Sequence, residues 1–366
     1  MKNHSKYIFY AGSLRPGGGL TVAKSIIESL SSDQSNQIIV FTGSKDSSRE
    51  LSKLFIEPNV QEKVFFHNAP SFVRYLISKL YFLLYTLFRN STLISINYYI
   101  PCWCKLFVYH INLLSFMQTE NDSFGFRVKR FDAKLACRWA NHNAFESKFL
   151  MEKAYSFVGY IRKPQLLYIG IDPVFFNQTR KNSWGKHKNP SILVVSSMQP
   201  HKDNKTAINT LVELLGHHSQ LEWRLTIVGG QSTSQWNELK KYAENLGVHN
   251  RVDFLGPQSK QDLVKLIQNS LCVLSTSLVE SFCMVAIESM AAGCPVLVTN
   301  ETSMPETVCD SAFMVEKSNH AVFASTILKL QFDDNLRNQM VEMGYKRASL
   351  FTQDLFKANF LELLNE

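Results

Sequence analysis

The sequence lacks the cysteine pattern of a disulfide-stabilised or zinc-binding protein. Its seven cysteines are an odd number scattered over 366 residues, and Cys102 and Cys104 have no second pair at the spacing of a zinc site. A secretion signal is not expected either, because the first short apolar run ends in a glycine-rich loop rather than a cleavage site. We therefore expect reduced thiols and a cytoplasmic protein, in which the sequons at Asn90 and Asn177 are chance matches.

Long uncharged hydrophobic runs are also missing. Ser71–Arg89 is rich in aromatic and aliphatic residues, but Arg74, Lys79 and Arg89 interrupt it, and it is too short and too charged for a comfortable transmembrane span. Two interpretations stay open. The segment is either a helix buried in its domain or an amphipathic helix on an anionic membrane surface, which a lipid-linked acceptor would explain.

The overall composition is that of a folded protein with room for two cores. Apolar residues make up 45% and charged residues 19% of the chain, without the signature of disorder. The formal net charge is +8. Such a charge favours anionic partners, which include nucleotide phosphates, lipid phosphates and nucleic acid, and charge alone does not choose among them.

Short apolar runs alternate with helical segments along the whole chain, as in a parallel α/β sheet. The expected strands fall into two sets, separated by the polar run Asn177–Pro190, a credible linker. We predict two facing Rossmann-like domains, 1–176 and 190–350, with a cleft between them. The strands are Tyr7–Ala11, Ile38–Thr42, Val64–Phe66, Leu93–Asn97 and Leu106–His110, then Ile192–Val195, Arg224–Val228, Val252–Leu255, Leu271–Leu274, Val296–Thr299 and Phe313–Glu316.

The most informative stretch is Ser275–Pro305. An apolar strand precedes it, a turn follows, and a helix is expected from about Cys283 to Ala292, where Gly293 ends it. Glu280 then lies in the loop before the helix, and Glu288 lies on its second turn. At roughly 1.5 Å of rise per residue, the two carboxylates would stand roughly 8 to 10 Å apart.

That arrangement suits a nucleotide diphosphate sugar. The free N–H groups of Phe282, Cys283 and Met284 and the positive end of the helix dipole favour an anion between the two acids. A carboxylate on either side can accept hydrogen bonds from hydroxyl groups. A sugar, a diphosphate and a ribose in sequence therefore fit the site, with Glu280 at one end and Glu288 at the other.

The same stretch resembles a known family. Glu280-Ser281-Phe282-Cys283, followed by Ile287-Glu288-Ser289-Met290-Ala291-Ala292-Gly293-Cys294-Pro295-Val296, is similar to the signature of retaining glycosyltransferases of the GT-B fold, family 4. Ser281 and Cys283 stand where that family usually has glycine, and both are small. The resemblance covers residues 160 to 365 well and the first 160 in outline.

The resemblance implies further donor-binding residues. Gly17, Gly18 and Gly19, in an expected glycine-rich loop before a helix, match the paired glycine that lies under the donor diphosphate. Lys202 matches a lysine that neutralises this diphosphate, while Ser197 replaces the usual arginine. His201 or Arg15 are the candidates that could compensate for the missing charge.

The resemblance also concerns the N-terminal half and the C-terminus. His110, at the end of an expected strand, is the candidate for a histidine that faces the donor sugar, and a buried structural histidine is the alternative. Tyr168–Phe176 resembles the segment that joins the two domains, and a C-terminal helix in 351–366 would cross back to the first domain. We interpret the basic segment Arg127–Arg138 as a solvated helix face without a ligand.

The function that the resemblance implies is retaining transfer of a hexose from a nucleotide diphosphate sugar, with formation of an α-linkage. The resemblance implies that Ser281 to Met284 bind the phosphates, that Glu280 binds the sugar and that Glu288 binds the ribose. It implies no need for a metal, another cofactor or a side-chain base. The expected acceptor is a glycan or a lipid-linked glycan, in bacterial O-antigen or capsule synthesis. We expect no nucleic-acid partner and allow peripheral contact with the inner membrane face. A nucleotide-sugar epimerase of the same fold and a non-catalytic nucleotide-sugar-binding subunit are the alternatives.

Overall fold

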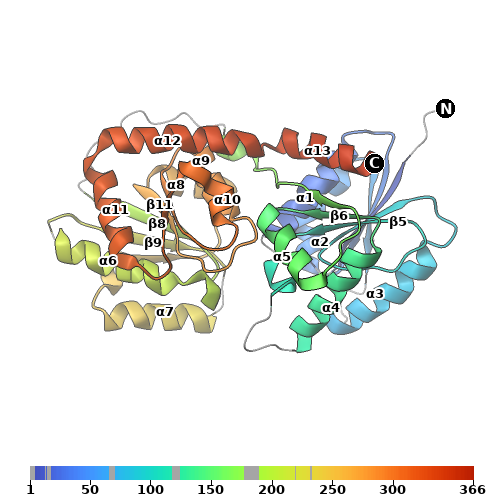
Figure 1. Ribbon diagram of the computed structural model, residues 1–366, viewed down its shortest axis with the longest axis horizontal. Coiled ribbons are helices and arrows are strands. Elements are labelled where there is room, and N and C mark those ends of the chain that lie inside the picture. The colour runs from blue at the N-terminus through green and yellow to red at the C-terminus, as the bar shows by residue number, and fades with distance from the viewer. Residues whose placement is uncertain are drawn as a thin grey trace. The chain divides into compact units, whose positions relative to one another are not determined.

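The structure is a computed structural model that describes residues 5–12, 14, 18–65, 71–117, 124–176, 189–218, 220–230 and 233–366 (Figure 1). The chain forms two compact units. Unit 1 consists of Met1–Gly170 with Gln353–Glu366, and unit 2 is Ile171–Thr352. Residues 171–176, which the sequence analysis placed in the first domain, therefore belong to unit 2. The linker predicted at Asn177–Pro190 lies almost wholly outside the described residues.

Unit 1 contains a parallel sheet of seven strands in the order β3-β2-β1-β4-β5-β6-β7. The strand order reverses between β1 and β4, which places the carboxyl ends of both strands at a crevice of the doubly wound kind. The strands are β1 (Lys6–Ala11), β2 (Gln37–Thr42), β3 (Val60–Val64), β4 (Thr92–Ile96), β5 (Lys105–His110), β6 (His142–Phe145) and β7 (Pro164–Leu166).

Helices connect most of these strands, as is usual for parallel pairing, whereas β4 and β5 are joined by residues 97–104 without a helix. Central strands are apolar on both faces because helices cover both; Ile8, Phe9 and Tyr10 of β1 are all buried. The helices of unit 1 are α1 (Gly18–Ser31), α2 (Lys45–Leu51), α3 (Ser71–Tyr85), α4 (Phe124–Trp139), α5 (Lys148–Val158) and α13 (Gln353–Asn365).

The prediction of strands in unit 1 was wrong at one position and missed two others. The strand expected at Val64–Phe66 lies at Val60–Val64, because the partly buried sequence Val-Gln-Glu-Lys-Val pairs with β2 while Val64 itself is exposed. β6 and β7 were not predicted, since they are short and polar and follow no apolar run. Tertiary pairing with β5, rather than local propensity, makes β6 a strand.

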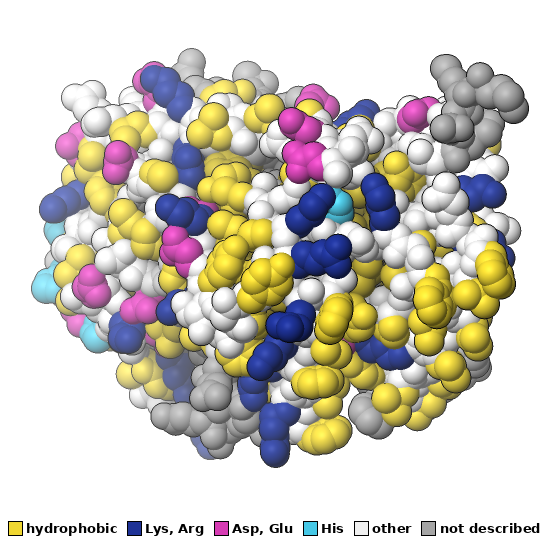
Figure 2. All heavy atoms as spheres, turned by 45° about the vertical axis from the view of Figure 1, so that its right-hand side comes forward, with side chains coloured by type: hydrophobic (Ala, Val, Ile, Leu, Met, Phe, Trp, Pro, Cys, Tyr) yellow, Lys and Arg dark blue, Asp and Glu magenta, His cyan; other side chains and the backbone are white. Residues whose placement is uncertain are grey.

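Helix α3 has one buried face and one exposed apolar face. Its inner face carries Ser78 and Phe82, which are buried, whereas Leu80 and Leu84 point outward and are each 63% exposed. Figure 2 shows hydrophobic and basic side chains gathered on the side of unit 1 where α3 and α4 lie. No helix in the described part of the chain is long and apolar enough to span a membrane.

The C-terminal helix α13 belongs to unit 1, as the fold resemblance implied. It lies against α1 (Figure 1), and Ser25 Oγ donates a hydrogen bond of 3.2 Å to Gln353 Oε1. Gly170 is required at this junction, because a Cβ there would come within 2.9 Å of the Gln353 Cα and of the Phe356 Cβ. Phe356 and Phe360 of α13 are buried.

Unit 2 repeats the architecture with a six-stranded parallel sheet in the order β10-β9-β8-β11-β12-β13. Its strands are β8 (Ser191–Val195), β9 (Arg224–Val228), β10 (Val252–Leu255), β11 (Cys272–Ser275), β12 (Val296–Thr299) and β13 (Phe313–Val315). Its helices are α6 (Asn204–His217), α7 (Thr233–Asn245), α8 (Lys260–Gln268), α9 (Met284–Ala291), α10 (Met304–Val308), α11 (His320–Phe332) and α12 (Asp334–Ala348).

The strand order of unit 2 reverses between β8 and β11, so the connections after these two strands are neighbours. The connection after β8 contains a short 3₁₀ turn, Pro200–Lys202, and the connection after β11 contains Glu280. In open parallel sheets this reversal point is where ligands bind. The fold of unit 2 alone therefore brings together two segments that lie some eighty residues apart in the sequence.

Candidate active site

The loop that carries Glu280 is fastened to the connection after β8. Thr276 Oγ1 donates to the carbonyl oxygens of Lys202 at 3.1 Å and Asp203 at 2.9 Å. The backbone N–H of Leu278 donates to the carbonyl of His201 at 2.7 Å. These bonds satisfy polar groups at the ends of two neighbouring strands and fix one loop against the other.

The other side of the loop is fastened to the connection after β12. The backbone N–H of Glu280 donates to Thr302 Oγ1 at 3.0 Å, and Ser303 Oγ donates to the Glu280 carbonyl at 3.0 Å. Thr307 Oγ1 donates to the carbonyl of Phe282. Sequence reasoning missed these hydroxyl groups. Their signal was a cluster of small polar residues directly after an apolar strand next to β11, where a parallel sheet delivers side chains to the same edge.

Lys202 and Glu280 form an ion pair. Lys202 Nζ lies 2.6 Å from Glu280 Oε1, and the two side chains are only 21% and 15% exposed. Sequence analysis selected both residues, one for phosphate and one for the sugar, without predicting that they meet. The pair holds a cation and an anion in fixed positions, and an anionic ligand at Lys202 must compete with the Glu280 carboxylate.

Helix α9 begins at Met284, one residue after the predicted start, and its N-cap residue Cys283 has a φ of 69°. This left-handed conformation favours glycine, which explains why the resembled signature has glycine there. Cys283 adopts it at some cost. Burial raises the pKa of its thiol to about 12, so the side chain stays neutral. No side chain caps the helix, and no described residue accepts a hydrogen bond from the N–H groups of Cys283 and Met284.

The flanking residues of this helix start have structural roles of their own. Phe282 is buried with its ring 5.3 Å from that of Phe351, at 69°, and so anchors the loop in the core of unit 2. Ser281 is half-buried. The open amide end of α9 therefore stands on a rigid support, which is the condition for binding an anion without reorganisation.

Glu288 lies on the second turn of α9 and is half-buried. Burial raises the pKa of its carboxyl group to about 7, with Lys260 acting in the opposite direction and Asp172 adding to the rise. Lys260 Nζ and Asp172 Oδ2 are themselves paired at 2.7 Å. Sequence analysis identified Glu288 but neither of its two charged neighbours, whose proximity depends on the packing of α8 against the turn Pro173–Phe175.

Neither His201 nor Ser197 replaces the positive charge of the missing arginine beside Lys202. His201 is half-buried, and burial together with the charge of Lys202 lowers its pKa, so its ring is neutral at neutral pH. Ser197, in the arginine position, contributes its carbonyl oxygen to Asn204 Nδ2 at 3.1 Å. Arg15, the other candidate, lies outside the described residues.

The glycine-rich segment of unit 1 differs from the prediction. Gly18 and Gly19 are the first two residues of α1 rather than part of a loop, and Gly17 lies outside the described residues. Glycine at a helix start exposes backbone N–H groups without side-chain cover. The donor-binding role of Gly17, Gly18 and Gly19 stays a prediction.

His110 lies in the core of unit 1. It is 0% exposed, its ring stacks on Phe145 with centroids 4.6 Å apart, and Nε2 donates to Asn143 Oδ1 at 2.9 Å. Asn143 Nδ2 donates to the carbonyl of Arg162, which fixes the orientation of the amide and hence the Nε2–H tautomer. This geometry supports the structural alternative over a histidine that faces a sugar.

Burial lowers the pKa of His110 to about 4 from an ordinary value of 6.5. Between these values the native state binds fewer protons than the unfolded state, so we expect the free energy of unfolding to fall as the pH drops below 6.5. Urea unfolding of the wild type and of His110→Gln, above and below pH 6.5, measures this. The variant should show a weaker pH dependence, and the exposed control His249→Gln should match the wild type. If His110→Gln instead abolished activity at unchanged stability, the structural role would be wrong.

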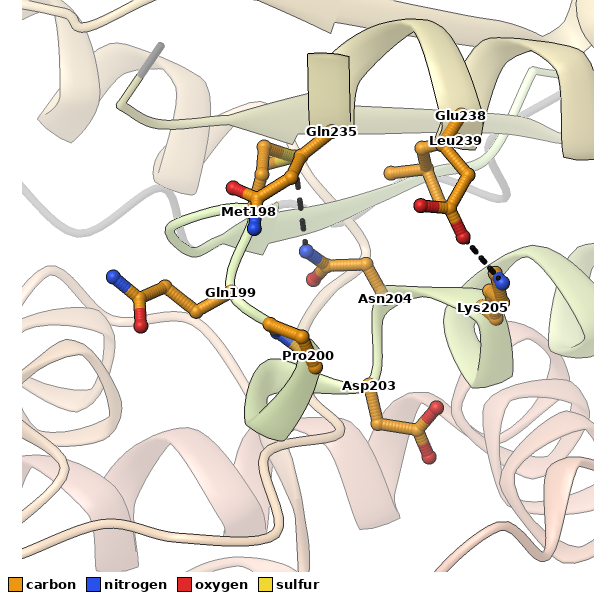
Figure 3. A pocket seen from close by; sticks show the side chains of 9 residues that line it. All are labelled: Met198, Gln199, Pro200, Asp203, Asn204, Lys205, Gln235, Glu238 and Leu239. Atoms are coloured by element: carbon orange, nitrogen blue, oxygen red, sulfur yellow. Dashed lines mark hydrogen bonds and ion pairs between the residues drawn. The ribbon is translucent and has the colours of Figure 1, made fainter. Parts of the chain in front are cut away.

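A pocket of about 180 Å³ opens beside the turn that ends in Lys202 (Figure 3). The Lys205–Glu238 ion pair, at 2.8 Å, bounds one side of it, and Asn204 points its amide nitrogen toward the sulfur of Met198. Neither Glu280 nor Glu288 lines this pocket. Separately, no group of three or more His, Cys, Asp or Glu residues in the described part of the chain is arranged to hold a metal ion.

Comparison with protein families and curated proteins finds glycosyltransferases. Residues 176–347 match the family model described as glycosyl transferases group 1. A D-inositol 3-phosphate glycosyltransferase of Corynebacterium jeikeium is 32% identical over 163 residues, 43% of this chain and 39% of that protein. One of the same name from Acidothermus cellulolyticus is 32% identical over 170 residues, 44% of this chain and 38% of that protein. The matches thus span about two fifths of these relatives.

Comparison with solved structures covers nearly the whole chain. The Anabaena protein Alr3699/HepE in complex with UDP-glucose has a TM-score of 0.80 at 18% identity, over 99% of this chain and all of that one. WaaG, described as a glycosyltransferase involved in lipopolysaccharide biosynthesis, has a TM-score of 0.77 at 16% identity, over 98% of both chains. At such identities the likeness shows the fold, and it confirms the predicted GT-B architecture of two Rossmann-like domains.

Proposed function

We propose that the chain is a retaining glycosyltransferase that uses a nucleotide diphosphate sugar, because residues 176–347 match the family model described as glycosyl transferases group 1. The observation that carries the proposal is the Lys202–Glu280 ion pair, 2.6 Å long, beside the open amide end of α9. A cation, an anion and a helix N-terminus then meet at the strand-order reversal of unit 2. These are the groups that a charged leaving group and a polyhydroxylated ring require.

The chemical difficulty of the reaction is the departure of the diphosphate. The bond between the anomeric carbon and the phosphate oxygen breaks, and a bond to the acceptor oxygen forms on the same face of the sugar. The departing phosphate oxygen takes the acceptor proton, so charge and protons balance without a side-chain base. Lys202 and the N–H groups of Cys283 and Met284 stabilise the negative charge that develops on the leaving group, without requiring a metal.

Binding of the donor involves an exchange of partners. Lys202 leaves Glu280 and binds the diphosphate, because a diphosphate carries more negative charge than a single carboxylate. The carboxylate of Glu280 then accepts hydrogen bonds from the sugar hydroxyls and stabilises the positive charge of an oxocarbenium-like transition state. Ser303 and Thr302, which bind the backbone of Glu280, keep the loop in place during this exchange. The ion pair therefore positions both groups before the donor arrives.

The acceptor is proposed to be a glycan or a lipid-linked glycan of bacterial surface polysaccharide, and the transferred sugar a hexose that ends in an α-linkage. The net charge of +8 supports an anionic or lipid phosphate acceptor. The relatives named for D-inositol 3-phosphate favour a second candidate, a phosphorylated polyol. A lipid-phosphate-linked glycan and a phosphorylated polyol share a phosphate group and a free hydroxyl.

Incubation with a panel of radiolabelled nucleotide sugars tests the proposal. Transfer of label to a lipid-linked glycan or to D-inositol 3-phosphate supports a glycosyltransferase and identifies the acceptor. Isomerisation of the sugar without an acceptor would show an epimerase. Binding detected by thermal shift without turnover of any pair would show a non-catalytic subunit.

The role of Glu288 predicts that donor affinity depends on pH. Because the pKa of Glu288 is about 7, its carboxylate, which accepts hydrogen bonds from both ribose hydroxyls, is protonated as the pH falls through 7. We expect donor affinity to fall in the same range and Glu288→Gln to be weaker-binding and insensitive to pH there. The raised pKa also means that the buried charge destabilises the native state above pH 7, so Glu288→Gln should have the higher melting temperature at alkaline pH. Equal donor affinity in both proteins on the alkaline side would contradict the role of Glu288.

A further inference from the structure

The outer face of α3 is exposed, and the side chains that the structure describes on it are aliphatic. It consists of Val73, Leu76, Leu80 and Leu84, spaced three or four residues apart on one side of the helix. A soluble protein rarely leaves a continuous apolar stripe in water, because covering it with lipid or protein is favourable in proportion to its area. The stripe therefore marks a binding surface.

Two aromatic residues extend this surface at the C-terminal end of α3. Phe88 is 96% exposed and has a φ of 62°, a conformation that a bulky L-residue adopts only under constraint. The exposed ring of Trp103 belongs to a neighbouring segment whose backbone N–H donates to Thr86 Oγ1 at 3.0 Å. Exposed Phe and Trp side chains of this kind are typical of segments that enter the interfacial region of a bilayer.

Helix α4 adds positive charge next to α3. Lys79 of α3 pairs with the buried Asp132 of α4 at 2.6 Å, which holds the two helices together. The outer face of α4 then carries an exposed Phe131 between basic residues, and its exposed basic side chains are Arg127, Lys134 and Arg138. The segment that sequence analysis treated as a solvated basic face is thus continuous with an apolar one (Figure 2).

Acidic residues are almost absent from this part of the chain. The sequence contains no Asp or Glu from Lys63 to Met117, and Asp132 is the one acid of α3 and α4. Since Asp132 is buried and paired with Lys79, the outer faces of both helices present only apolar and positively charged side chains among the described residues. Such a surface is complementary to anionic lipid headgroups.

A pocket of about 510 Å³ lies where α3 ends, at the N-terminal edge of the unit 1 sheet. Leu87 and Phe88 line it together with two cations, Lys6 and Arg89, and none of the described residues that line it is acidic. The guanidinium of Arg89 stacks on the ring of Tyr85, with 4.4 Å from its central carbon to the ring centroid, which fixes its position at the rim. An apolar wall beside two cations matches the junction of a lipid phosphate and its acyl chains.

We propose that unit 1 binds the surface of an anionic phospholipid membrane through the outer faces of α3 and α4, with a lipid phosphate in the pocket at Lys6 and Arg89. A second copy of the chain is a poorer occupant. A twofold interface would place this patch against itself and bring basic residues together without acidic partners. Membrane binding of this kind does not depend on any step of sugar transfer. It would bring the protein close to an acceptor that is itself bound to the membrane.

Cosedimentation with vesicles tests the proposal. The wild type should bind vesicles that contain phosphatidylglycerol, bind pure phosphatidylcholine weakly, and lose binding as salt is added. Leu80→Glu and Phe88→Ser should each lower the partition coefficient about tenfold. Lys6→Gln and Arg89→Gln should each lower it about fivefold. All four residues are exposed, so the variants should remain folded.

Matched substitutions in unit 2 serve as controls. Leu350→Glu, Phe332→Ser and Lys241→Gln make the same kinds of substitution at exposed residues outside the patch and should leave vesicle binding unchanged. The proposal is overturned if the wild type ignores anionic vesicles, if neutral vesicles bind it equally, or if Leu80→Glu splits a dimer without affecting lipid. Hydrolysis of the sugar donor, measured without lipid, should be the same in Leu80→Glu and the wild type, which separates this test from that of the proposed function.

Discussion

Replacement of Lys202 by glutamine is expected to lower kcat/KM for sugar transfer by about a hundred- to a thousandfold. Lys202 lies close enough to the start of α9 for its charge to act on the Cys283 thiol, and neither Ser197 nor the neutral His201 supplies a second cation. Loss of this charge leaves the departing diphosphate with helix amides alone. Steady-state kinetics with the donor sugar, under conditions where the variant is folded, measure the effect.

The chain offers a close control for this experiment. Lys205, three residues later, pairs with Glu238 at 2.8 Å on a more exposed surface. Lys205→Gln removes the same charge from the same connection and should change kcat/KM less than about twofold, because an exposed ion pair contributes little. Equal losses in Lys202→Gln and Lys205→Gln would mean that general electrostatics, rather than contact with the leaving group, explains the result. Lys202→Gln should also destabilise unit 2 by about 1–3 kcal/mol, since it leaves Glu280 without its cation.

Replacement of Glu280 by glutamine should have a different kinetic signature. The amide keeps the size of the side chain but cannot stabilise positive charge on the sugar, so kcat should fall by about a hundredfold or more. The donor KM should stay level or decrease, because Lys202 no longer has to leave a carboxylate before it binds phosphate. A large drop in kcat without a rise in KM indicates an interaction made in the transition state.

Glu238→Gln is the corresponding control, and a double-mutant cycle completes the test. If Lys202 and Glu280 act through one another, the loss in the double variant should be smaller than the product of the two single losses. Independent losses would show that the 2.6 Å ion pair is incidental to catalysis. An unchanged kcat in Glu280→Gln would remove Glu280 from the mechanism altogether.

Much of the fold followed from local sequence pattern. Buried parallel strands require near-continuous apolar runs, so β9 and β12 could be predicted with their exact bounds. The half-buried edge strand β10 was also predicted with its exact bounds, and helix α9 within one residue at each end. The pattern failed where strands are short and polar. β6 and β7 exist because neighbouring strands offer hydrogen bonds, and a sequence window does not contain those neighbours.

The main residues of the candidate site could be predicted from the sequence, but their partners could not. Glu280, Glu288 and Lys202 could be selected because the signature and its spacing define a loop and a helix start. The family signature has glycine at the position of Cys283, and this glycine already pointed to a left-handed backbone conformation there. The partners of these residues, such as Thr302 for Glu280 and Lys260 near Glu288, come from other connections and could not be inferred from spacing.

The amino-acid sequence by itself determined the strands and helices whose apolar residues follow a clear pattern. It also determined where the acidic and basic residues of the site lie along the chain. Tertiary structure alone decided that Lys202 and Glu280 meet, that His110 is buried, and that Leu76, Leu80 and Leu84 of α3 face outward. The physical reason is the range of the forces involved. Periodicity and capping act over a few residues, whereas burial and ion pairing depend on which distant segments the sheet order brings together.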